Sequence, residues 1–166
     1  MNIDDIYGQA TGVDIKEQEY LAELGDERAK GYLGERLVFK NLYKFVDIPC
    51  KFLLNVEVPT SGGKTTEIDL LMIHSTGIYV FEMKHYKGII YGDKNGERWT
   101  QYFKTQPNVS FKSPLKQNEY HILALQQHVP NMPIYSFIVF TNEEDCQLKV
   151  DVHDDIIDVC IIYSYL

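Results

Sequence analysis

Four charged side chains stand close together in the otherwise apolar stretch TTEIDLLMIHSTGIYVFEMKHYKG, residues 65–88. The stretch predicts two strands joined by a tight turn, and residues two apart in a strand share a face. Glu67 and Asp69 would then share one face of the first strand, and Glu82 and Lys84 one face of the second. Two adjacent carboxylates suit a hard divalent cation, and a lysine beside them could orient a water or stabilise a phosphate.

The turn decides whether these two faces coincide. A loop of Ser75-Thr76, or of residues 74–77, places Asp69 across from Glu82 and Glu67 across from Lys84, with Cβ atoms about 4.5–5.5 Å apart. An odd-length loop would mix the apolar residues of the two faces, so the hydrophobic pattern favours the clustered arrangement. A simpler interpretation remains open, in which Glu67 and Lys84 form a cross-strand ion pair and Asp69 is solvated.

Two predicted helices carry polar residues that could flank this cluster. Glu35 lies along the apolar stripe of a helix predicted over residues 26–45, where a carboxylate is costly unless it has a partner. A second helix is predicted to begin at Pro114. Gln117 lies in its first turn, and His121 one turn further on.

The order of the predicted elements indicates an α/β fold with a mixed sheet between helices. Strands are expected at residues 51–59, 66–85 as a hairpin, 88–112 as a second hairpin around Asn-Gly, 133–141, and near the end of the chain. Residues 1–25 are acidic and weakly periodic, so we expect an arm or short helix outside the core.

The composition fits a single globular domain of 166 residues with 45% hydrophobic residues. No apolar run is long enough for a bilayer, and the acidic start does not resemble a secretory signal, so we expect a cytoplasmic protein that does not contact membranes. Three scattered cysteines argue against a zinc site or a disulfide framework. Motifs typical of P-loop, Rossmann, metalloprotease and serine-hydrolase sites are absent from the sequence.

The net charge of −8 conceals a basic segment. Residues 84–116 hold seven basic and two acidic residues, net +5, between acidic ends at residues 1–28 and 142–166 that each carry −6. Such a segment is compatible with a loop that contacts phosphates. The simpler interpretation is that long surface loops are charged.

Three stretches, GYLGERLVFKNL, EIDLLMIHSTGIYVFEMKHYKGIIYG and SPLKQNEYHILAL, resemble the nuclease-related (NERD) domain over roughly Gly31 to Thr141. That domain is grouped with the PD-(D/E)xK restriction-endonuclease-like superfamily. The resemblance implies a restriction-endonuclease-like α/β fold over residues 26–166, with a mixed β-sheet of about five strands flanked by helices on both faces. Residues 1–25 would precede it as an acidic arm or short helix.

The resemblance also implies a function, a metal-dependent endonuclease or nickase domain that hydrolyses DNA phosphodiester bonds with Mg²⁺ or Mn²⁺. Asp69 and Glu82 look like the metal-binding carboxylates, and Glu35 like the helix glutamate that supports the metal. Lys84 looks like the lysine that positions or activates the attacking water. Gln117 looks like the helix glutamine near the site.

Other residues have weaker support. Glu67 stands where the superfamily's short name has proline, so we expect it to support the site from outside the metal shell. His121, Lys87 and Tyr86 are candidate nucleic-acid contacts, as is Lys116. Each is more commonly a solvated or packing residue.

Two alternatives remain open at this point. The chain could be a catalytically inactive nucleic-acid-binding module with the same fold. It could also be a protein-interaction module whose twelve tyrosines form a partner surface. Because the chain stops soon after the last predicted strand, we also expect a further domain or partner protein.

Overall fold

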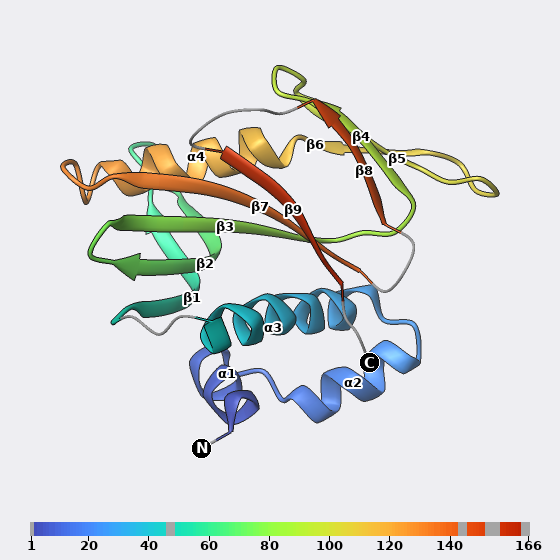
Figure 1. Ribbon diagram of the computed structural model, residues 1–166, viewed down its shortest axis with the longest axis horizontal. Helices are drawn as coiled ribbons and strands as arrows, with labels where there is room; N and C mark the ends of the chain where they lie inside the picture. The colour runs from blue at the N-terminus through green and yellow to red at the C-terminus, as the bar shows by residue number, and fades with distance from the viewer. Residues whose placement is uncertain (1, 46–48, 143–145, 152–156, 164–166) are drawn as a thin grey trace.

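A computed structural model describes residues 2–45, 49–142, 146–151 and 157–163. Within these ranges the chain forms a mixed sheet with helices on both faces and a smaller second sheet beside it (Figure 1). The predicted α/β class and its helices on both faces are confirmed. No helix in the described part of the chain is long and apolar enough to cross a membrane.

The main sheet has five strands in the order β1-β2-β3-β7-β9. Their bounds are Lys51–Pro59 (β1), Thr65–His74 (β2), Gly77–His85 (β3), Ile134–Asn142 (β7) and Ile157–Tyr163 (β9). β1, β2 and β3 pair antiparallel, whereas β3, β7 and β9 pair parallel. Strand β7 lies between β3 and β9, and its sequence, IYSFIVFTN, is nearly all apolar, as expected for a strand covered on both faces.

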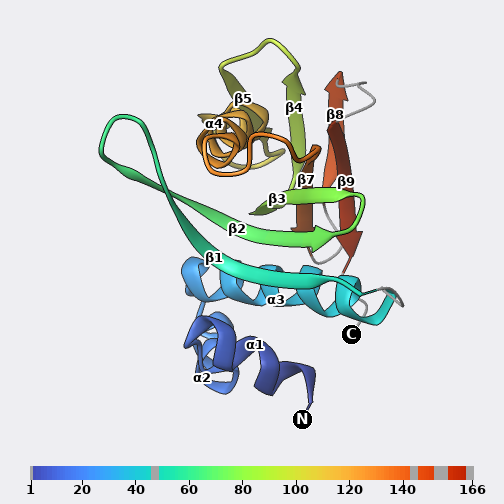
Figure 2. The same cartoon turned by 90° about the vertical axis from the view of Figure 1, so that its left-hand side faces the viewer.

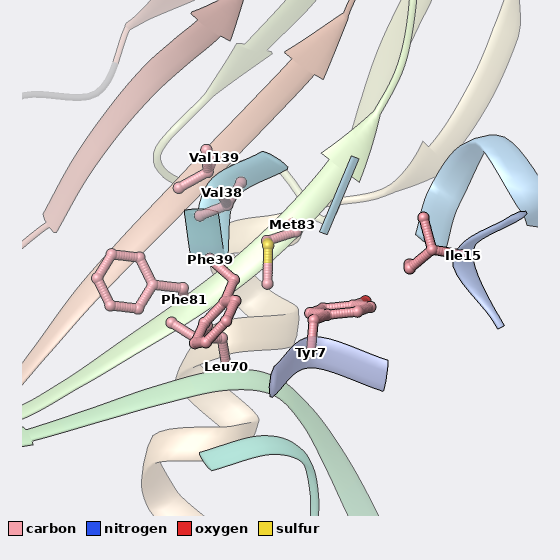
Figure 3. Packing of buried hydrophobic residues seen from close by; sticks show 8 residues of the cluster. All are labelled: Tyr7, Ile15, Val38, Phe39, Leu70, Phe81, Met83 and Val139. Atoms are coloured by element: carbon pink, nitrogen blue, oxygen red, sulfur yellow. The ribbon is translucent and has the colours of Figure 1, made fainter. Parts of the chain in front are cut away.

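Helices α3 (Glu27–Phe45) and α4 (Pro114–Gln126) cover opposite faces of the main sheet (Figure 2). On the α3 face, Val38 and Phe39 pack with Leu70 and Phe81 (Figure 3). A second cluster on the α4 face holds Val58, Ile68, Leu71, Ile78, Val80, Ala124 and Leu125. Burial of these two apolar layers is the main favourable term in folding.

The N-terminal residues form two helices, α1 (Ile3–Thr11) and α2 (Ile15–Glu23), packed against α3 (Figure 2). The expectation that residues 1–25 lie outside the core is wrong, because Tyr7 and Ile15 are buried in the cluster on the α3 face (Figure 3). Several of the acids there have partners within the protein, among them Asp4, Asp14 and Glu19. The carboxylate of Asp4 forms an ion pair with Arg36 of α3 at 2.7 Å, which links α1 to α3.

The second sheet has the order β6-β5-β4-β8. Its strands are β4 (Ile89–Asp93), β5 (Arg98–Tyr102), β6 (Val109–Lys112) and β8 (Gln147–Asp151). The hairpin expected around Asn-Gly is confirmed as β4–β5. Its inner face packs Ile90 and Trp99 against Phe140 of the main sheet. Much of the basic segment is therefore an ordered sheet rather than a loop.

Candidate active site

The hairpin β2–β3 turns at Ser75-Thr76, with His74 opposite Gly77 and Leu70 opposite Phe81. This is the predicted register. The ladder ends at Leu70, however, and the carboxylate of Asp69 takes the place of a main-chain acceptor. Its Oδ2 accepts a hydrogen bond of 2.7 Å from the backbone amide of Met83. Asp69 is thereby held at the point where β2 leaves β3.

Strand β2 changes face at Asp69. Leu70 packs in the cluster on the α3 face, but Ile68, two residues earlier, packs in the cluster on the α4 face. Regular strands keep such residues on one face, so the chain must turn over between them. Across the ladder, β1 has Asn55 in the left-handed conformation, with φ of 52°. Asparagine tolerates this conformation better than most residues.

After this change of face Glu67 is no part of the hydrogen-bonded cluster, although its charge helps to raise the pKa of Glu35. Glu67 is exposed and lies opposite Glu57 of β1. Within the described residues, no hydrogen bond or ion pair joins it to Lys84. The expectation that Glu67 lies beside Asp69 and across from Lys84 is wrong, because it assumed a regular strand through Asp69.

Glu82 and Lys84, two apart on β3, share a face and bind each other. Glu82 is 1% exposed, and its Oε1 accepts a hydrogen bond from the Lys84 ammonium. The same ammonium donates to Oε1 of Gln117, on α4, at 3.2 Å. Burial alone would lower the pKa of Lys84, but the charges of Glu82 and Asp69 outweigh it and raise that pKa. Lys84 therefore stays charged in a largely buried place.

His121 occupies the other side of Glu82. The ring is 4% exposed. Its Nε2 lies 3.1 Å from Oε2 of Glu82, and its Nδ1 lies 2.7 Å from the hydroxyl of Thr66 on β2. The ring is buried and both nitrogens are paired within the protein, so its contacts favour a role inside the site over the expected nucleic-acid contact, which stays a prediction.

Glu35 reaches the cluster from α3. Its neighbour Gly34 faces the sheet so closely that a Cβ there would lie 2.4 Å from the Thr141 hydroxyl, so only glycine allows this approach. The Tyr7 hydroxyl donates to Oε2 of Glu35 at 3.3 Å. Burial, followed by the charge of Asp69, raises the pKa of Glu35 to about 7.

Asp69 has a similarly perturbed carboxyl. Burial and the charge of Glu82 raise its pKa to about 7, although the Met83 amide and Lys84 act in the opposite direction. Asp69 thus couples electrostatically to Glu35 on one side and to Glu82 on the other. Three carboxyls share a buried region with one ammonium, so the site has a deficit of positive charge.

The donor set suits a hard cation, because it consists of carboxylate oxygens. The described residues contain no group of three or more His, Cys, Asp or Glu side chains already gathered as a metal-binding set. Both oxygens of Glu82 already accept hydrogen bonds. Each carboxylate oxygen has a further lone pair, however, so these bonds leave acceptor capacity on Glu82.

The remaining sequence candidates lie outside this cluster. Tyr86 is half-buried, with its ring 4.9 Å from that of Phe111, so it packs within the protein. Lys116 forms an ion pair with Glu119 at 3.0 Å. Lys87 is exposed near the end of β3.

Sequence reasoning missed Tyr7 and Thr66. Both make hydrogen bonds to residues far along the chain, Tyr7 to Glu35 and Thr66 to His121. Tyr7 lies in a segment whose acids suggested a solvated arm, and Thr66 looks like an ordinary strand residue. The spacing of Gln117 and His121, one turn apart on a helix, was the available signal that α4 presents two polar side chains on one face.

Known proteins resemble this chain over the part that carries the candidate site. The profile of the family described as nuclease-related domain (NERD) matches residues 30–141. An uncharacterized protein of Bacillus anthracis is 40% identical over 126 residues, which cover 75% of this chain and 58% of that protein. The chain therefore spans somewhat more than half the length of this relative. No solved structure matches the present chain significantly.

Proposed function

Because the chain belongs to the nuclease-related domain family, we propose that it is a metal-dependent endonuclease or nickase domain that hydrolyses phosphodiester bonds of DNA. One observation carries the proposal. Three carboxyls, Glu35, Asp69 and Glu82, are coupled in a buried site beside the ammonium of Lys84. Such perturbed acids with a specific charge partner are typical of functional sites.

Asp69 and Glu82 would hold a Mg²⁺ or Mn²⁺ ion, with Glu35 supporting it. The ion, when bound, would supply Lewis-acid stabilisation of the phosphate and of the leaving oxygen. It would also supply the positive charge that the three carboxyls lack, and so favour their ionised forms.

Lys84 would act on the phosphate and the attacking water. Its ammonium is fixed by Glu82 and Gln117, which use two of its three N–H donors. The third is left to orient a water or to stabilise charge developing on the phosphate. Burial strengthens this interaction, because the effective dielectric constant is lower than in water.

Nicking of supercoiled plasmid in Mg²⁺ or Mn²⁺ tests the proposal. We expect Glu82→Ala and Lys84→Ala to lower the rate at least about 100-fold. Lys16→Ala, on the exposed face of α2, is the control and should match the wild type. Equal nicking by all four proteins would reveal a contaminating nuclease and refute the assignment. DNA binding without nicking by the wild type would favour the inactive binding module instead.

A further inference from the structure

The buried histidine on α4 is fully paired by two strand residues. The ring of His121 lies between Oε2 of Glu82, at 3.1 Å, and the hydroxyl of Thr66, at 2.7 Å. Glu82 comes from β3 and Thr66 from β2, near where the two strands separate. His121 therefore links both strands of the hairpin to α4 across the candidate site.

The chemistry of the two partners fixes the orientation of the ring. An ionised carboxylate only accepts hydrogen bonds, so Nε2 of His121 must carry the hydrogen that it shares with Glu82. The hydroxyl of Thr66 can donate to Nδ1 or accept from it, so it satisfies the second nitrogen in either case. A second partner of this kind holds a histidine in one orientation.

Glu82 is in turn held from both sides. Lys84 donates to its Oε1 and His121 to its Oε2. The donors therefore restrict rotation of the carboxylate, whose terminal torsion is otherwise broad. The ammonium of Lys84 is bound by Gln117, one helical turn before His121. A single face of α4 thus sets the position of both reactive groups on β3.

We propose that Thr66 and His121 are positioning residues, which hold the Glu82 carboxylate in the orientation that binds the metal. The inference rests on the proposed function. His121 would act through Glu82, whose carboxylate it holds, and not on the ion or the DNA directly. Loss of a residue that hydrogen-bonds to a metal ligand typically lowers metal affinity by about 10- to 100-fold.

A purely structural role for the histidine would give a different result. Loss of a buried hydrogen bond would then lower stability, with no selective effect on metal binding. Mn²⁺ affinity, measured by calorimetric titration of the folded protein, separates the two roles. Melting temperature without metal reports the structural effect alone.

Thr66→Val and Thr66→Ser form the matched pair, because serine keeps the hydroxyl that valine removes. We expect Thr66→Val to weaken Mn²⁺ binding about 10-fold or more, and Thr66→Ser to bind like the wild type. His121→Leu should weaken binding further, and His121→Gln, which keeps a donor, should recover part of it. His128→Gln, an exposed residue two positions beyond the end of α4, should leave Mn²⁺ binding unchanged.

The same variants should have different effects on kcat and on KM. In plasmid nicking, Thr66→Val should lower kcat and leave KM for DNA nearly unchanged, because Glu82 is misplaced while the DNA-binding surface is intact. Equal Mn²⁺ affinity for Thr66→Val, Thr66→Ser and the wild type would overturn the inference, whatever their melting temperatures. If the His121 variants do not fold, the Thr66 pair still decides.

Failure of the proposed function has a separate signature, in which the wild type neither binds Mn²⁺ nor nicks DNA. The long-range ¹H–¹⁵N spectrum of the histidines then tests the positioning of the ring directly. We expect a hydrogen on Nε2 of His121 in the wild type and a changed Nδ1 signal in Thr66→Val. A hydrogen on Nδ1 alone, or an identical Thr66→Val spectrum, would contradict the inference.

Discussion

Glu35 and Asp69 are acids in positions where negative charge is costly. Both have pKa values raised to about 7, in each case chiefly by burial, and each is further raised by a neighbouring carboxylate. The folded protein keeps these protons in a pH range where the unfolded chain, with ordinary carboxyls, has lost them. The two groups therefore make the free energy of unfolding depend on pH without any contribution from catalysis.

The sign of this dependence follows from proton binding. Between about pH 4 and pH 7 the folded state binds more protons, so this contribution to stability falls as the pH rises and levels off above about pH 7. At about pH 8 without metal, we expect Glu35→Gln and Asp69→Asn to melt a few degrees above the wild type. At about pH 4 the difference should vanish.

Thermal melts at the two pH values, with and without Mn²⁺, check this prediction. Mn²⁺ should raise the wild-type melting temperature more at about pH 8 than at about pH 4, because protons compete with the ion. Glu119→Gln, an exposed change on α4, is the control. The difference between its melting temperature and that of the wild type should be about the same at both pH values. Lower stability of Glu35→Gln at about pH 8 would contradict the assigned direction of the pKa shift.

At the scale of elements, the site depends on how closely α3 approaches the sheet. A Cβ on Gly34 would lie 2.4 Å from the Thr141 hydroxyl and 3.1 Å from Nδ1 of His85. These two side chains are hydrogen-bonded to each other at 3.2 Å, and Thr141 is buried. They have little freedom to move, so a larger residue would push α3 and Glu35 away from β3.

Gly34→Ala and Gly31→Ala make a matched test on one helix. We expect Gly34→Ala to lose about 1–3 kcal/mol through overpacking. A Cβ on Gly31 meets no atom within 4 Å, so Gly31→Ala should gain up to about 1 kcal/mol from helix propensity. Urea unfolding measures both. Equal stability of the two variants would show that α3 tolerates a greater distance from the sheet.

At the scale of the whole molecule, an acidic protein carries basic residues on its second sheet. Arg98 of β5 and Lys112 of β6 lie directly opposite each other, and both are exposed. Like charges in this arrangement repel. A phosphate backbone bound across them would relieve the repulsion, so if the proposed function holds we expect DNA to bind on this face.

Binding to a labelled oligonucleotide at several salt concentrations, without divalent cations, tests this surface. Affinity should fall as salt rises. Arg98→Gln and Lys112→Gln should each weaken binding and reduce the salt slope by about 1. Lys16→Gln on α2 should leave both unchanged. Unaltered slopes for the β5 and β6 variants would place the DNA elsewhere on the molecule.

The sequence by itself determined the two long helices, the main strands and the pairing within the two hairpins. Apolar periodicity identified α3, α4 and the strands of the main sheet, and the Ser75-Thr76 turn with its hydrophobic pattern specified the register of β2 against β3. These are properties of short segments, because periodicity reports which face of an element is buried. They sufficed to bring Glu82 and Lys84 to one face of β3.

Only the tertiary structure decided how the flanking residues meet the strands. The reversal of face at Asp69 coincides with a left-handed residue, Asn55, on the neighbouring strand, and no periodicity within β2 predicts it. The contacts of Tyr7 with Glu35 and of Thr66 with His121 join residues distant in sequence. Such contacts arise when several elements close around one core, and periodicity within a single element carries no information about its partner on another.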